Sequence, residues 1–216
     1  WLATGEDVPS AYPATAEDTI DRSRGYRLGG ILRFEDTESY AYTLGDGAPS
    51  YSHSKVKKYL RHFLWLKKVS GWSCPVAVVF DDVVATQASF RKAYLLHTVD
   101  QPEVNGRTVT ARNGEGVLYH QTLTPTFVDI AVLGGPGMEF LVGGQNYPPI
   151  RAPVGKEQPG AWRVEVSPVL PSADHRFLHV LYPADAGTPA PEQARGFVAG
   201  PLQGCALGEW MVFFDF

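Results

Sequence analysis

The sequence has only two cysteines, Cys74 and Cys205, and no apolar run long enough to cross a membrane as a helix. Two cysteines in 216 residues are too few for the disulfide framework of a small secreted domain. Because free cysteine packs as a small apolar residue, we expect two buried thiols, with one disulfide as the alternative. A membrane-spanning helix needs about 20 mostly apolar residues, so the sequence predicts no membrane span.

Positive charge is also scarce. The 19 Lys and Arg are outnumbered by 23 Asp and Glu, which gives a formal net charge of −4, and the basic residues form no long run. Nucleic-acid-binding proteins concentrate Lys and Arg against the phosphates. The sequence therefore predicts no nucleic-acid partner.

Long helical patterns are missing as well. The 22 Gly and 17 Pro predict many turns, and apolar residues make up 44% of the chain, enough for a substantial core. Apolar residues alternate at period two in about ten to twelve short segments separated by turn signals. This pattern predicts an all-β fold, an antiparallel β-sandwich. We expect an irregular leading segment over residues 1–28 and a single β-sandwich domain over 29–216.

The central stretch, residues 57–98, holds three apolar runs, at 59–66, 76–85 and 93–99. The first alternates two faces, and the second is rich in β-branched residues and too short for a free-standing helix. The simplest arrangement is a meander of three consecutive antiparallel strands.

Two further segments predict turns. Asn113–Gly114 lies between two alternating arms and predicts a tight hairpin with both residues at positive φ. Residues 148–160 are rich in Pro and Gly and predict a loop of about a dozen residues, a length at which loops are often functional.

An ordered set of segments resembles a known family. YLRHFLWLKK, VAVVFDDVVA, KAYLLHT, GGPGMEF followed by GGQNYP, GAWRVEVSP and FLHVL occur in this order within residues 29–182. Together they resemble the C-terminal β-sandwich region of heparinase II/III-like polysaccharide lyases. The resemblance implies a secreted or periplasmic location and an acidic polysaccharide as partner.

The resemblance also implies a reaction. Members of this family cleave uronate-containing polysaccharides by β-elimination, in a cleft between an α/α-toroid and the β region. A base removes the proton next to the carboxylate, an acid protonates the leaving oxygen, and a third group neutralises the carboxylate. This sequence contains no toroid, so none of the toroid's catalytic residues maps onto it. We therefore expect the β part of a larger lyase, with a helical toroid domain or chain as partner, and an isolated chain that is inactive.

Three residues are candidates for the catalytic roles. Tyr51 and His53 alternate on one face of a segment that leads into a strand, and they suit the roles of acid and base. Arg61 suits the role of carboxylate neutraliser, because its planar guanidinium matches a carboxylate. The alternative for Arg61 is an ion pair with a neighbouring acidic residue.

Candidate substrate-binding residues are Trp72, Tyr147 and Arg163. Trp72 and Tyr147 lie in turns rich in Gly and Pro, where an exposed ring can stack on a sugar. Arg163 has the alternative of a cross-strand ion pair involving Glu165. For the other strand tryptophans, Trp65 and Trp162, core packing is the favoured interpretation.

The six histidines show no compact metal-ligand spacing, so we expect no bound metal and no cofactor. If a metal is present, the first suspects are His97, His179 and Asp81, because the two histidines meet on one face if their strands are adjacent. The alternative is that each is a hydrogen-bonded core histidine.

Three functions compete at this point. The first is the β portion of a polysaccharide lyase. The second is a non-catalytic carbohydrate-binding or structural module, and the third is a hydrolase or epimerase that acts on the same sugars. The full reading frame distinguishes them, because an upstream run of amphipathic helices, if found there, would favour the first.

Overall fold

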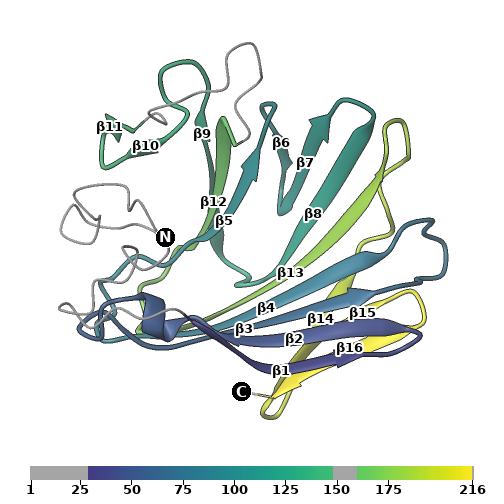
Figure 1. The fold of residues 1–216 in the computed structure, drawn as a ribbon, viewed down its shortest axis with the longest axis horizontal. Helices are drawn as coiled ribbons and strands as arrows, with labels where there is room; N and C mark the ends of the chain where they lie inside the picture. The colour runs from purple at the N-terminus through teal and green to yellow at the C-terminus, as the bar shows by residue number, and fades with distance from the viewer. Residues whose placement is uncertain (1–28, 148–159, 216) are drawn as a thin grey trace.

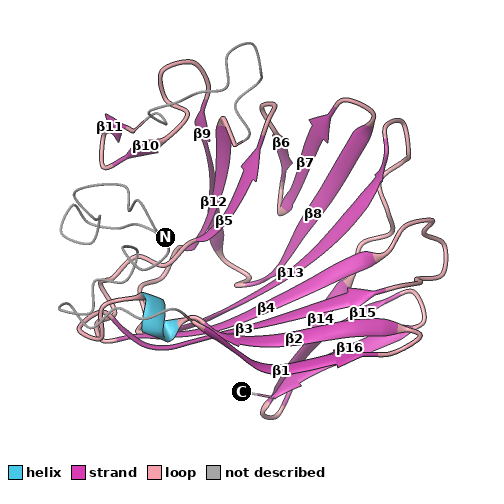
Figure 2. Ribbon diagram, viewed as in Figure 1, coloured by secondary structure: helices cyan, strands magenta, loops and turns pink. Residues whose placement is uncertain are grey.

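The computed structural model describes residues 29–147 and 160–215, and most of these residues lie in β-strands joined by turns and loops (Figure 2). The regular elements are sixteen strands and one 3-10 turn, η2 (Ala48–Ser50). The predicted leading segment, 1–28, and nearly all of the predicted loop at 148–160 lie outside the described residues. No helix among the described residues is long and apolar enough to cross a membrane.

An eight-stranded antiparallel sheet forms the middle of the molecule (Figure 1). Its strands, in spatial order, are β1 (Gly30–Asp36), β2 (Tyr40–Asp46), β3 (Val56–Leu66), β4 (Val76–Ala85), β13 (Asp174–Asp185), β8 (Gly116–Thr124), β7 (Thr108–Asn113) and β6 (Glu103–Asn105).

Two three-stranded antiparallel sheets accompany the central sheet. One contains, in order, β5 (Tyr94–Thr98), β12 (Trp162–Pro168) and β9 (Val128–Gly134), and the other contains β14 (Arg195–Ala199), β15 (Leu202–Leu207) and β16 (Trp210–Asp215). A short hairpin pairs β10 (Leu141–Val142) with β11 (Gln145–Asn146).

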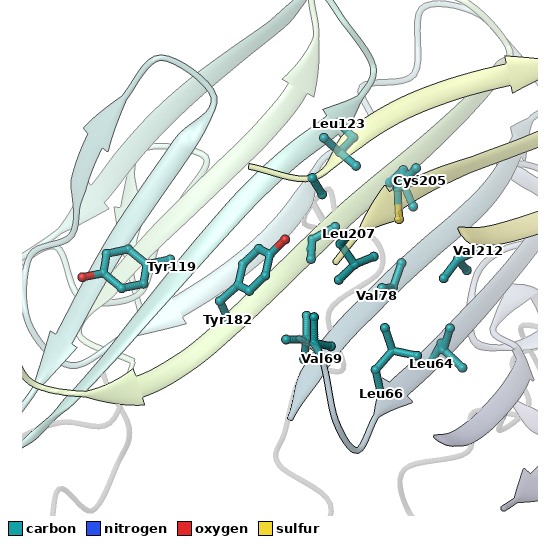
Figure 3. Close-up of a cluster of buried hydrophobic side chains, with 14 of the residues drawn as sticks. Leu64, Leu66, Val69, Val78, Tyr119, Leu123, Tyr182, Cys205, Leu207 and Val212 are labelled. Carbon is teal, nitrogen blue, oxygen red and sulfur yellow. The ribbon is translucent and has the colours of Figure 1, made fainter. Parts of the chain in front are cut away.

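Each small sheet packs on one face of the central sheet through its own core cluster. On one face, Val78 and Leu64 of the central sheet pack with Cys205, Leu207 and Val212 of β15 and β16 (Figure 3). On the other face, residues of β4, β7 and β13 pack with β5 and β12. These residues are Val79, Val109, Phe177, Tyr94, Val164 and Val166. The predicted β-sandwich is therefore confirmed, and the central sheet is packed on both faces.

The predicted meander is only half right. β3 and β4 pair as expected, but the next strand, β5, joins a different sheet, and β13 takes the place beside β4. β4 is buried on both faces, and β13 beside it is buried on both faces over residues 177–180. Leu178 and Val180 of β13 are completely buried, whereas β5 carries the exposed His97.

The predicted hairpin forms one residue later than expected. β7 ends at Asn113, which pairs with Gly116, so the two turn residues are Gly114 and Glu115. Gly114 has φ of +54°, and no residue other than glycine has a positive φ among the described residues. The left-handed conformation is therefore taken by glycine, which adopts it without steric cost.

Both cysteines are free, as expected for thiols. Cys205 is completely buried in the core cluster of Figure 3, whereas Cys74 is only partly buried. Burial raises the pKa of the Cys205 thiol to about 12, so this thiol stays protonated and packs as an apolar group.

The packing of the core predicts that replacing Phe80 destabilises the fold far more than replacing Phe127. Phe80 is 0% exposed and stacks on Phe214 with ring centroids 4.8 Å apart, whereas Phe127 is 72% exposed. We expect Phe80→Ala to lower the free energy of unfolding by about 3–5 kcal/mol, because it leaves a cavity. Phe127→Ala, the control, is expected to stay within about 0.5 kcal/mol of the wild type. Urea unfolding measures both, and equal losses for the two variants contradict the packing described here.

Candidate functional site

A buried carboxylate holds an arginine at the surface of the central sheet. Arg61 of β3 and Asp81 of β4 are directly opposite each other, so their side chains share one face. Arg61 donates from Nε to Asp81 Oδ1 and from Nη2 to Oδ2, each at 2.7 Å. The Asp81 side chain is 4% exposed and that of Arg61 is 44% exposed. The carboxylate thus fixes a guanidinium that remains accessible to solvent.

Aromatic rings complete the surroundings of this guanidinium. Arg61 Cζ lies 5.7 Å from the ring centroids of both Tyr59 and Tyr94. Tyr51 contacts Tyr59 edge to face, with centroids 5.8 Å apart. We call Tyr51, Tyr59, Arg61, Asp81 and Tyr94 the Arg61 cluster. Its two cation–π contacts and two ion-pair hydrogen bonds hold the arginine in one orientation.

Burial sets the protonation of the Arg61 cluster. It raises the pKa of Tyr51 and of Tyr94 to about 12, and in both cases Arg61 acts in the opposite direction. Burial also raises the pKa of Asp81, while the hydrogen bonds from Arg61 oppose this shift. The phenols therefore remain protonated at neutral pH and can donate hydrogen bonds, but they are poor bases.

Two buried histidines lie behind Tyr94. The Tyr94 ring is 3.8 Å from His179 and 5.2 Å from His120, measured between centroids. His120 Nε2 is 2.9 Å from His179 Nδ1, and Thr122 Oγ1 is 3.2 Å from the same nitrogen. Both rings are completely buried, and His120 Nδ1 and His179 Nε2 have no hydrogen-bond partner among the described residues. Burial lowers the pKa of His120 to about 4 and that of His179 well below its usual value, so both rings are neutral.

The three predicted catalytic residues occupy different environments. Arg61 forms the ion pair that was its alternative interpretation, and it still exposes part of its guanidinium. Tyr51 is half-buried in the Arg61 cluster, whereas His53 is exposed on the turn that precedes β3. Because this segment turns instead of extending, the period-two argument does not place Tyr51 and His53 on one face. Their roles as acid and base stay predictions.

The three predicted substrate-binding residues differ in exposure. Tyr147 is 49% exposed, and its hydroxyl donates to Gln145. Trp72 is partly buried against the core, and its Nε1 donates to the carbonyl of Pro183 at 3.1 Å. Arg163 is buried and pairs at 2.7 Å with Glu165 on its own strand, not across strands as expected. Tyr147 is therefore the most accessible of the three.

The metal suspects do not come together. His97 is exposed on β5 and points to the face opposite Tyr94, whereas His179 on β13 is completely buried against Tyr94, so the two histidines do not meet. His179 contacts His120 instead, and Asp81 is engaged by Arg61. No group of three or more metal-binding side chains occurs within residues 29–147 and 160–215.

Sequence reasoning missed three members of this region: Tyr59, Tyr94 and His120. Tyr59 was within reach, because it alternates on the same face of β3 as Arg61. Tyr94 and His120 lie on β5 and β8, and no local pattern brings these strands to Arg61. The position of Tyr94 depends on how β5, β12 and β9 pack on the central sheet, and that of His120 depends on the pairing of β8 with β13.

The buried histidines predict that stability falls in mild acid. In the unfolded chain, histidine takes up a proton near pH 6.5, whereas folded His120 does so only near pH 4. A group with a lowered pKa stabilises the fold above its unfolded pKa, and this contribution is lost as the pH falls. We expect the free energy of unfolding to drop by about 1.4 kcal/mol for His120 alone between pH 7.5 and pH 5.5, and further for His179.

Urea unfolding at the two pH values measures this loss, and NMR titration assigns it to individual rings. Partial burial lowers the pKa of His62 and His175 as well, so both contribute with the same sign. An NMR titration in which His120 and His179 both protonate near pH 6.5 contradicts the prediction.

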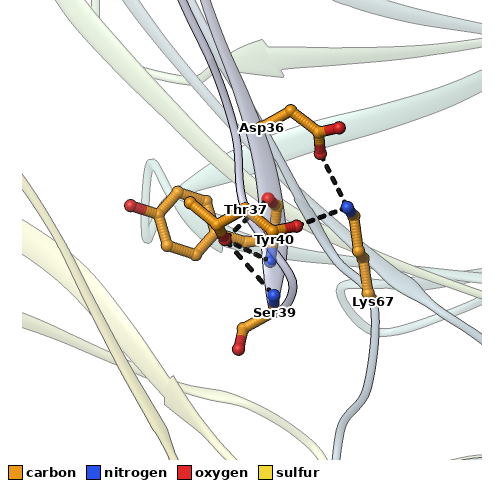
Figure 4. Close-up of polar contacts among 5 residues, drawn as sticks. All are labelled: Asp36, Thr37, Ser39, Tyr40 and Lys67. Atoms are coloured by element: carbon orange, nitrogen blue, oxygen red, sulfur yellow. Dashed lines mark hydrogen bonds and ion pairs between the residues drawn. The ribbon is translucent and has the colours of Figure 1, made fainter.

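The Arg61–Asp81 ion pair is expected to contribute more to the free energy of unfolding than an exposed ion pair does. Asp81→Asn leaves Arg61 without its buried counter-charge, and breaking such pairs costs about 3–5 kcal/mol. Because Arg61 is 44% exposed, we expect a smaller loss, about 2–3 kcal/mol. The control is Asp36→Asn. Asp36 binds Lys67 at 2.6 Å in an exposed pair at the β1–β2 turn (Figure 4), where we expect a change of about 0–1 kcal/mol. Similar unfolding midpoints for the two variants contradict the prediction.

Comparisons with known proteins give matches among solved structures. A scan against protein-family models and a search of the curated proteins find no match. Heparan sulfate lyase HepC from Pedobacter heparinus matches with a TM-score of 0.56 and 15% identity, over 87% of this chain and 28% of that chain. A mutant of the same lyase matches with a TM-score of 0.55 and 14% identity, over the same shares of the two chains.

A structure of heparinase III gives a TM-score of 0.57 and 12% identity, over 87% of this chain and 27% of that chain. The chain thus spans little more than a quarter of the length of these proteins. At such identities the similarity establishes the fold: the chain has a heparinase-like β fold.

Proposed function

We propose that the chain is the β portion of a larger polysaccharide lyase that cleaves uronate-containing polysaccharide by β-elimination. The observation that carries this proposal is the fold, which matches 87% of this chain to about a quarter of a heparan sulfate lyase. The Arg61 cluster supports it, because a fixed and accessible guanidinium is suited to a uronate carboxylate.

β-Elimination requires three roles in one place. Arg61 neutralises the carboxylate, which makes the neighbouring C–H acidic. His53 takes that proton, the electron pair forms the new C=C bond, and the C–O bond to the leaving sugar breaks. Tyr51 donates a proton to the leaving oxygen, a role that suits a phenol with a raised pKa.

Substrate contacts and partners follow from the same proposal. Tyr147, which is 49% exposed, offers a ring for stacking on a sugar, whereas Trp72 and Arg163 act through the turns and strands that they hold in place. The partners are an acidic polysaccharide and a helical toroid domain or chain of the same enzyme. A secreted or periplasmic location fits such a substrate.

A second function is favoured by a specific observation. Tyr51 is half-buried and His53 is exposed on a turn, and one open sheet face does not enclose a sugar from both sides. This arrangement favours a non-catalytic carbohydrate-binding or structural module for the isolated chain. Hydrolysis or epimerisation of the same sugars is a third function, and no contact among the described residues favours it.

The proposal predicts no useful cleavage by residues 1–216 alone. The assay follows the absorbance of the unsaturated uronate product with heparan sulfate, hyaluronan and alginate. We expect no increase in absorbance, because the described residues contact a bound sugar from one side only and do not enclose it. The same assay on the full-length protein is expected to give product with at least one substrate.

Variants of the full-length protein assign the roles. Arg61→Gln, Tyr51→Phe and His53→Ala are expected to lower kcat/KM by roughly 100-fold or more. Trp162→Phe is the control and is expected to keep the activity. A full-length protein that yields no unsaturated product from any acidic polysaccharide refutes the lyase proposal. Product from residues 1–216 alone refutes the proposal that cleavage requires the helical toroid domain or chain.

A further inference from the structure

The face of the central sheet that carries Arg61 has a row of small residues along β2. Directly opposite residues of antiparallel strands share a face. On this face Ala41 is opposite Trp65, Thr43 is opposite Phe63, and Gly45 is opposite Arg61. A Cβ added at Gly45 meets nothing nearer than 3.8 Å. Along β2, the small row thus lies beside three large side chains of β3.

The edge strand β1 borders the same row on its other side. Ile31 is opposite Gly45, Phe34 is opposite Thr43, and Asp36 is opposite Ala41. Ile31 is 67% exposed and Phe34 is 68% exposed. The small residues of β2 therefore lie between two rows of larger ones. We call this surface the β2 strip: Ala41, Thr43 and Gly45, with their flanking residues Ile31, Phe34, Asp36, Arg61, Phe63 and Trp65.

Neither core cluster uses the aromatic residues of the β2 strip. The cluster on this face draws on β4, β7 and β13 from the central sheet, and β1 to β3 lie beyond it. The rings of Phe63 and Trp65 are nearly parallel, with an interplanar angle of 12° and centroids 6.4 Å apart. Phe63 is 39% exposed. Two parallel rings on one strand can meet successive sugar rings in the same orientation.

A cationic side chain lies on each side of Phe63 and Trp65 along the chain. Asp81 occupies Nε and Nη2 of Arg61, and Nη1 makes no hydrogen bond to any described residue. Six residues after Arg61, just beyond the end of β3, Lys67 is held by Asp36 and by the carbonyl of Thr37 (Figure 4). Six strand residues span about 20 Å, enough for several sugar units. Along this row the side chains are, in order, a cation (Arg61), two aromatic rings (Phe63 and Trp65) and a second cation (Lys67).

From these contacts we propose that the β2 strip binds an acidic oligosaccharide that lies along β2. Its sugar rings stack on Phe63 and Trp65, and a carboxylate or sulfate binds the free edge of Arg61. Phe34 borders the ligand on the β1 side. The acidic nature of the ligand rests on the proposed function, whereas the stacking surface does not. The strip thus gives the chain a binding site that works without any catalytic step.

The test measures binding of residues 1–216 to size-defined heparan sulfate oligosaccharides by titration calorimetry. We expect Phe63→Ala to weaken binding by roughly 3- to 10-fold, the loss of one aromatic contact. Thr43→Glu is expected to weaken it at least as much, because it places a negative charge in the middle of the strip. Phe213→Ala is the control. Phe213 is 47% exposed, and it lies on β16 against Phe197, away from the strip.

Two further measurements make the outcome decisive. Urea unfolding checks that each variant folds, and neutral dextran replaces heparan sulfate to test the need for acidic groups. Wild-type binding that the strip variants leave unchanged, or no wild-type binding at all, overturns the proposal. So does a wild type that dimerises through this face, with Phe63→Ala abolishing the dimer instead of the glycan binding.

The experiments distinguish a wrong proposal for the β2 strip from a wrong lyase proposal. Binding lost in Phe63→Ala and Thr43→Glu, together with a full-length protein that never cleaves, supports the strip and refutes the lyase. Cleavage by the full-length protein, with binding unchanged in both variants, refutes the strip alone.

Discussion

The burial of β4 on both faces is the constraint on which the rest of the structure depends. Its two consecutive acids, Asp81 and Asp82, point to opposite faces and are both almost completely buried. A buried carboxylate without a counter-charge is costly, so each face must supply a cation. The neighbouring strand β3 supplies both: Arg61 pairs with Asp81, and Lys58 pairs with Asp82. The register of β3 against β4 is therefore fixed by charge as well as by apolar packing.

The same constraint produces the chemistry of the surface. A free arginine side chain samples many rotamers, and a ligand must order it on binding. Here Asp81, Tyr59 and Tyr94 have already ordered Arg61, while part of its guanidinium stays exposed. A carboxylate that stabilises the sheet thus also preorganises a site for an anion.

The sequence predicted what depends on strand periodicity. The two faces of β3, the buried run of β4 and the Gly114 hairpin all follow from local alternation and turn residues. It did not predict that β13 lies beside β4, that Tyr94 joins the Arg61 cluster, or that His120 contacts Tyr94. Those contacts join segments far apart in the chain, and only tertiary packing selects them. The turn at His53 was missed because Tyr51 and His53 fit an extended segment equally well.

The parts of the central sheet that the two small sheets cover stabilise the fold, whereas the part that they leave uncovered is available to a ligand. One face is packed by β14, β15 and β16, and the other is packed by β5, β12 and β9 only over β4, β7 and β13. On that second face β1 and β3 keep large apolar side chains exposed, among them Ile31, Phe34 and Phe63, a costly arrangement on an edge strand unless a ligand or partner uses them. Arg61 stands at the boundary, with Asp81 and Tyr94 on its covered side and the β2 strip on its open side. Anything that binds the strip therefore reaches, through one guanidinium, the ion pair that holds β3 against β4.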